Sequence, residues 1–173
     1  VDLKWDFNPT PTELISLTAF YKLIKNPISR IEVASAGGYL SYENIADKAT
    51  VAGVEVEVRK NLFVRPLSSA ANGMNKLSFG LNGSYIYTNA KMPLATVTTG
   101  SQLEGAAPWI ANFDLSHNFT KGTHSFINTL VFNYVSDKIY TIGTQGYQDI
   151  MEQGMMTLDF VSQAKLNKYV SLT

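Results

Sequence analysis

The sequence predicts an all-β protein whose strands are long, antiparallel and two-faced. Apolar and polar side chains alternate most regularly from Ala49 to Leu62, ATVAGVEVEVRKNL. Two sets of side chains there have opposite parity: Val54, Val56 and Val58 against Glu55, Glu57 and Arg59. Because successive side chains of a strand point to opposite faces, this stretch has an apolar face and a charged face. No stretch shows a helical period over about eleven residues.

The same alternation predicts six further strands and the start of an eighth. The expected ranges are Val1 to Phe7, Thr12 to Lys25, Asn75 to Ala90, Pro108 to Phe119, Thr123 to Asp137 and Met155 to Leu166, with the last strand beginning at Tyr169. Most of these strands span about 12 to 16 residues, whereas strands of soluble proteins usually span about 5 to 6. Crossing a bilayer at a tilt of about 45° needs roughly 9 to 11 residues. Strand length therefore favours an antiparallel transmembrane β-barrel.

The connections between these strands alternate in length. Three are short or tight, at Pro9 to Pro11, Phe119 to Gly122 and Leu166 to Lys168. Three are long, at Asn26 to Lys48, Lys91 to Ala107 and Lys138 to Gly154, and Phe63 to Met74 is intermediate. Long loops without structure of their own are unusual in a compact soluble domain. Short turns at one end and long loops at the other are typical of an outer-membrane barrel.

Aromatic residues recur at the spacing of two membrane interfaces. Trp109 and Phe119 share a parity and lie ten positions apart. At about 3.3 Å per residue and a tilt near 40°, this spacing corresponds to roughly 25 Å of height, the separation of two aromatic girdles. Two further pairs lie eight positions apart, Phe79 with Tyr87 and Phe126 with Tyr134. The alternative is a soluble sandwich or a lipocalin-like barrel, in which the apolar faces would cover a core.

Composition narrows the class further. The 173 residues carry no net charge, and 16% are charged, below the roughly 25% of soluble domains. No basic run points to nucleic acid, and without cysteine there is no disulfide or thiol chemistry. No apolar run is long enough for a transmembrane helix. The chain starts with Val1 and not Met, so we expect a mature product or a piece of a larger protein.

No motif indicates an enzyme, and we predict no catalytic residue, no cofactor and no metal site. A nucleophile elbow, a phosphate-binding glycine loop and an H-E-x-x-H motif are all missing from the sequence. The two histidines, His117 and His124, flank one short turn with the apolar parity, so we expect both at the rim of the apolar face. Glu55 and Glu57 share a face, but the nearby Arg59 favours a charged wall over acid–base chemistry.

Three motifs, in order, resemble TonB-dependent outer-membrane receptors. The run from Asn44 to Arg59, NIADKATVAGVEVEVR, resembles a barrel strand of that family with the pattern N…KA…GVE.E.R. The run from Ala107 to Phe113, APWIANF, is similar to the P-W-x-x-N start of another strand. The following hairpin is similar through Asn133 to Ile139, Asp149 to Glu152 and Leu158 to Phe160. The resemblance covers nearly the whole chain.

The resemblance implies a fragment of a receptor. We expect residues 1–173 to form seven to eight consecutive strands from the C-terminal part of a 22-stranded barrel, without the plug domain, the early strands and the final strand. It implies a location in the outer membrane of a Gram-negative bacterium. The implied partners are outer-membrane lipid, the rest of the barrel and plug, the TonB complex through the plug, and a surface lipoprotein in some members, with no nucleic acid.

The implied function is energised uptake of a scarce ligand, a ferric siderophore, haem, cobalamin or a glycan. Weak candidates for contact with it are the loop aromatics Tyr39, Tyr42, Tyr140 and Tyr147, which would stack on a sugar or catecholate or simply pack their own loops. The wet inner wall would be made by Glu55, Glu57, Arg59, Asn82, Asn112, Asp114, Asn133 and Asp159. Two alternatives stay open, a small stand-alone structural or adhesion barrel and a soluble β-barrel that binds small apolar ligands.

Overall fold

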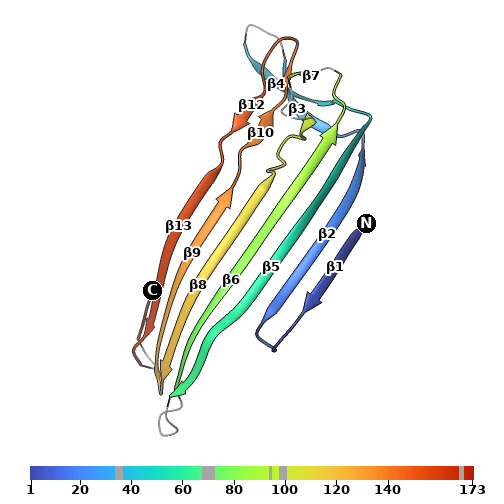
Figure 1. Ribbon diagram of the computed structural model, residues 1–173. Helices are drawn as coiled ribbons and strands as arrows, with labels where there is room; N and C mark the ends of the chain where they lie inside the picture. The colour runs from blue at the N-terminus through green and yellow to red at the C-terminus, as the bar shows by residue number, and fades with distance from the viewer. Residues whose placement is uncertain (34–36, 68–72, 94, 98–100, 168–169) are drawn as a thin grey trace.

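One large antiparallel sheet dominates the protein (Figure 1). The computed structural model describes residues 1–33, 37–67, 73–93, 95–97, 101–167 and 170–173. The sheet contains, in spatial and chain order, β1 (Asp2–Phe7), β2 (Leu14–Lys25), β5 (Lys48–Leu67), β6 (Gly73–Ala90), β8 (Trp109–Lys121), β9 (His124–Val135), β13 (Met155–Lys165) and β14 (Ser171–Leu172). The all-β prediction and the eight strands are confirmed, although the predicted start of the last strand, Tyr169, lies outside the described residues. The sheet does not close into a barrel within these residues. No helix among the described residues is long and apolar enough to cross a membrane.

The register places polar and apolar side chains on opposite faces along the middle of the sheet. One row of cross-strand partners is entirely apolar: Phe7, Ile15, Val58, Leu81, Phe113, Phe132 and Leu158. The neighbouring row, which points the opposite way, is entirely polar: Asp6, Ser16, Glu57, Asn82, Asn112, Asn133 and Thr157. We call these sides the apolar face and the polar face. A slip of one residue in any pairing would exchange them, so the register is strongly specified.

The apolar face has no protein cover in the described structure. Trp109 is 55% exposed and Phe160 is 67% exposed, although both lie on that face. Tyr85 packs against Trp109 with ring centroids 4.5 Å apart near the long-loop ends of the strands, and Phe119 lies 6.5 Å from Phe126 near the opposite ends. These two aromatic levels match the predicted girdles.

The long connections contain strands of their own. They form three small sheets at one end of the large sheet, β3 (Ile28–Val33) with β4 (Tyr39–Asn44), β10 (Lys138–Thr141) with β12 (Ile150–Glu152), and β7 (Ala95–Val97) with β11 (Gly143–Thr144) (Figure 1). The prediction that these connections are structureless loops was therefore wrong. Their strands are short, at most six residues, and a local pattern of that length is easily missed.

A β-bulge interrupts β5 and changes which side its residues face. Asn61 is opposite Ser78 on the polar face, whereas Phe63 is opposite Leu77 on the apolar face, and Leu62 between them has no partner in the register. The predicted strand end at Leu62 was wrong, because the strand continues after the bulge to Leu67. The expected connection from Phe63 to Met74 is correspondingly shorter, and part of it lies outside the described residues.

The turn between β8 and β9 is also tighter than predicted. Lys121 is paired with His124, so only Gly122 and Thr123 form the turn, in place of the expected Phe119 to Gly122. Gly122 has a φ of 60° and occupies the first central position, as type II′ hairpin turns require.

The β1–β2 turn stabilises the bulge. The Asn61 backbone N–H donates to Glu13 Oε1 over 3.0 Å, and Asn61 Nδ2 donates to Thr12 Oγ1 over 2.8 Å. Glu13→Ala removes the acceptor and should destabilise the folded protein by about 1–2 kcal/mol, since the backbone donor at the bulge loses its partner. The unfolding midpoint of the detergent-solubilised protein measures this, and Glu13→Gln, which keeps a carbonyl acceptor, is the control. Equal midpoints for both variants would contradict the role of this bond.

A second prediction separates the two faces. Leu81→Arg places a charge in the middle of the apolar face and should destabilise the protein in lipid by about 2–4 kcal/mol. Asn82→Arg, at the next residue and on the polar face, should reduce the stability much less, because its side chain meets water. Unfolding of both variants in lipid vesicles provides the comparison, and similar losses in the two variants would show that the apolar face does not meet lipid.

Candidate functional site

The three long connections fold together into one structure, which we call the cap (the described parts of residues 26–47, 91–107 and 138–154). Its first core is formed by Ile31, Ile45, Ile139 and Ile142, all buried. Ile142 joins the β3 strand by two backbone bonds, donating to Arg30 O over 3.0 Å and accepting from the Glu32 N–H over 3.3 Å. Segments more than 100 positions apart in the sequence therefore form one sheet-like unit.

A second apolar core attaches the cap to the large sheet. Leu103 packs with Ala46, Ala49 and Ala90, and the Leu103 N–H donates to Thr88 Oγ1 over 3.0 Å. Thr88 and Ala90 have the parity of the polar face. The segment around Leu103 consequently covers the polar face at the long-loop end of the sheet.

Arg30 is the polar centre of the cap. Its Nε lies 3.8 Å from Glu104 Oε1, and its backbone N–H donates to the other oxygen of the same carboxylate. Its guanidinium also lies 4.3 Å from the ring centroid of Tyr140 and 5.8 Å from that of Tyr42. The Tyr42 side chain is the main cause of a raised pKa of Arg30, so the guanidinium stays charged. Arg30 Nη1 is buried and has no hydrogen-bond partner within the described part of the chain.

The structure brings together two of the four predicted tyrosines. Tyr42 and Tyr140 both flank Arg30 and remain 64% and 42% exposed. Tyr39 lies opposite Val33 in the β3–β4 hairpin, and the Tyr147 N–H donates to Thr144 O over 3.1 Å. Neither of these two contacts the Arg30 cluster in the described structure, and a role of any of the four in ligand binding stays a prediction.

Sequence reasoning missed Arg30 and Glu104. They lie 74 positions apart, and neither belongs to a motif. The one available signal was the alternation of Arg30 and Glu32 with Ile31 and Val33, which is typical of a strand and would have placed Arg30 on its polar side.

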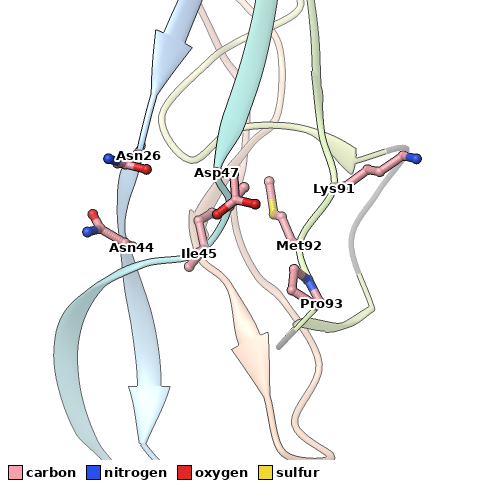
Figure 2. A pocket seen from close by; sticks show the side chains of 8 residues that line it. Asn26, Asn44, Ile45, Asp47, Lys91, Met92 and Pro93 are labelled. Atoms are coloured by element: carbon pink, nitrogen blue, oxygen red, sulfur yellow. The ribbon is translucent and has the colours of Figure 1, made fainter.

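A cleft of about 600 Å³ lies where the cap joins the sheet. Figure 2 shows Asn26 and Asn44 on one side of it and Met92 and Pro93 on the other, with Asp47 between them. Ile45, Ala46 and Lys91 complete the lining. Amide and carboxylate groups next to an apolar surface can bind a ligand that offers both hydroxyl groups and carbon surface.

All residues of the predicted inner wall have the parity of the polar face. These residues are Glu55, Glu57, Arg59, Asn82, Asn112, Asp114, Asn133 and Asp159. Asn112 Nδ2 donates to Asn82 Oδ1 over 3.2 Å, which links two of the strands. Arg59 Nη2 lies 2.7 Å from Glu57 Oε1, so the carboxylate is paired and serves as part of a charged wall.

Gly80 makes a notch in this wall between Arg59 and Asp114. It is the register partner of both, and a Cβ at this position would lie 2.2 Å from Asp114 Oδ1. The notch opens to two small clefts of about 280 and 100 Å³ that share Arg59, Gly80 and Asp114. The Asp114 carboxylate therefore occupies space that any side chain at position 80 would fill.

The histidines lie far from the cap. His117 Nε2 is 2.8 Å from Asn75 Oδ1, and His124 is paired with Lys121 beside the short turn. Nowhere in the described residues do three or more His, Cys, Asp or Glu side chains gather as metal ligands would.

Comparison with known proteins decides the class. The family described as TonB dependent receptor-like, beta-barrel, matches residues 1–173. The chain belongs to this family. Members are β-barrels of the Gram-negative outer membrane that contain a plug and interact with TonB. No curated protein and no solved structure matches the chain.

Family membership confirms the predicted resemblance and orients the sheet. In outer-membrane barrels the short turns are periplasmic and the long loops extracellular. The cap, at the long-loop end of the sheet, corresponds in position to the extracellular loops of such barrels. The polar face corresponds to their interior wall, and the apolar face to their lipid-facing surface.

The link between Arg30 and Glu104 yields a third prediction. Glu104→Ala should speed hydrogen exchange at the Arg30 and Gly105 backbone amides by about tenfold, because the cap loses a partly buried ionic hydrogen bond. Glu152→Ala removes the more exposed ion pair of the cap, with Lys138 at 3.1 Å, and should change these amides little. Equal exchange in the two variants would show that Glu104 does not hold the cap together.

Proposed function

We propose that this chain is part of the barrel of an outer-membrane receptor that takes up a scarce ligand with energy supplied through TonB. The proposal rests on the family match over all 173 residues. The two faces of the sheet, one polar and one apolar and uncovered, agree with that match. In this proposal residues 1–173 are one partial barrel domain. The plug, the remaining strands and the energy-coupling segment belong to other parts of the receptor.

The cap and the cleft supply the proposed ligand contacts. The cleft lined by Asn26, Asn44 and Asp47 offers hydrogen-bond donors and acceptors, and the exposed rings of Tyr42 and Tyr140 lie on the same extracellular structure. Aromatic rings and amides together suit a hydroxyl-rich ligand. Among siderophores, haem, cobalamin and glycans, this surface favours a glycan or a hydroxyl-rich siderophore.

The two alternatives have less support. A stand-alone structural or adhesion barrel would have no use for TonB, whereas the family interacts with it. A soluble binder of apolar ligands needs its apolar face inside, and here that face carries exposed residues such as Trp109 and Phe160. The proposal assigns no catalytic activity to the chain, because the matched family consists of receptor barrels.

Growth of the native bacterium tests the proposal. A strain deleted for the receptor gene should fail to grow on one nutrient of a panel of ferric siderophores, haem, cobalamin and oligosaccharides, and an active TonB system should be needed for rescue.

In the receptor that restores growth, Asn26→Ala with Asn44→Ala should raise the nutrient concentration for half-maximal growth by about tenfold, since each amide hydrogen bond contributes about 1 kcal/mol. Asn133→Ala with Asn112→Ala, on the wall below the cap, is the control for fold. Rescue without TonB would point to the stand-alone barrel.

A further inference from the structure

Three lysines form one row at the extracellular ends of three neighbouring strands. Lys25 of β2 is the register partner of Lys48 of β5. Lys91 directly follows Ala90, the partner of Ala49, and so continues the row beyond the end of β6. All three side chains are exposed.

The row lies on the lipid side, above the tyrosines of the outer girdle. Lys25 has the parity of Tyr21 and Leu23, and in the register Tyr21 and Tyr87 both lie opposite Ala52. Lys25 lies four positions after Tyr21, which places the lysines about 10 Å above the tyrosine level. This is the height of lipid headgroups above an aromatic girdle.

The positive charges of the row are not neutralised by ion pairs. Within the described part of the chain, the ion pairs are those of Lys4, Arg30, Arg59 and Lys138, so none includes a lysine of the row. Like charges directly opposite each other in a sheet repel. Asp47 is the nearby acid and shares the lining of two clefts with Lys91. It offsets one of the three charges and leaves a net positive surface.

A cleft completes the site. It measures about 400 Å³ and is lined by Asp47, Lys48, Thr50, Asn89 and Lys91. Thr50 and Asn89 are register partners on the lipid side, directly below Lys48 and Lys91. Their hydroxyl and amide groups would add neutral hydrogen bonds to the charged contacts of the two lysines. Leu23, the register partner of Thr50 in the same row, is 66% exposed and offers apolar surface.

We propose that this lysine row binds the phosphate groups of a phosphorylated glycolipid in the outer leaflet of the membrane. The inference rests on the proposed function, because it needs the cap on the extracellular side of an outer membrane. Ammonium groups form strong charge-assisted hydrogen bonds with phosphate. An amphiphile fits better than a soluble anion, since charged groups lie above apolar side chains on one lipid-facing surface. The acyl chains would pack along Leu23 and the tyrosine girdle, and the bound lipid would relieve the repulsion within the row.

The test uses the full-length receptor purified from outer membranes in mild detergent. Native mass spectrometry counts the phosphorylated glycolipid that stays bound after detergent exchange. K25Q/K48Q/K91Q should retain roughly tenfold less than the wild type, since each lysine contributes to attraction of the anionic headgroup. K25R/K48R/K91R should retain the lipid. K60Q/K121Q/K165Q makes the same charge change at the periplasmic end and is the matched control.

The inference would be overturned if K25Q/K48Q/K91Q and the control retained equal amounts of the lipid. It would also be overturned if delipidated protein retained a dephosphorylated glycolipid equally well, or if equimolar inorganic phosphate displaced the lipid. Binding of a lipoprotein at the row in place of lipid would overturn it as well. Failure of the proposed function is distinguishable, because a receptor absent from the outer-membrane fraction would be recognised before any lipid is counted.

Discussion

The structure depends on the pairing of every long strand with its neighbours in a single register. In lipid no water can satisfy a free backbone group, so a membrane-spanning strand must make its hydrogen bonds within the sheet. Here that same pairing also sorts the side chains, as the apolar row through Val58 and the polar row through Glu57 show. The separation of the apolar face from the polar face follows from this pairing.

Departures from this regularity are local and are supported by specific contacts. The bulge at Leu62 exposes a backbone donor, and Glu13 from the neighbouring turn accepts its hydrogen bond. Gly80 omits a side chain where Asp114 needs room. Gly122 adopts a positive φ where two strands reverse in two residues. Each departure lies where the chain turns, bends or shapes the inner wall.

The cap follows a different organisation from the sheet. The apolar cores of the described structure are made by isoleucines and Leu103 of the cap together with alanines of the cap and of the adjoining sheet. Met92 packs against both cores and joins them. The cap is consequently a small folded unit with its own core, placed where the polar face opens to the outside. Such a unit can present Tyr42, Tyr140 and the cleft in fixed positions.

Much of the large sheet was predictable from sequence, and the cap was not. Strand alternation is a local property with a period of two, so long strands such as Pro108 to Phe119 were placed to within a few residues. The bulge was missed because a single extra residue shifts the parity without changing the composition. In the candidate site, Tyr42 and Tyr140 were predicted from the sequence. No sequence motif near either tyrosine indicated that Arg30 would contact both.

The sequence by itself determined the two-faced strands, their order and the family, because each is written in side-chain alternation and in short contiguous motifs. Only the tertiary structure decided which segments contact one another at the long-loop end of the sheet. The Arg30–Glu104 contact spans 74 positions, and Thr144 donates to Glu32 O across 112. The row of Lys25, Lys48 and Lys91 exists only through the pairing of three strands. Local periodicity carries no information about such contacts, since they arise when separate segments pack together.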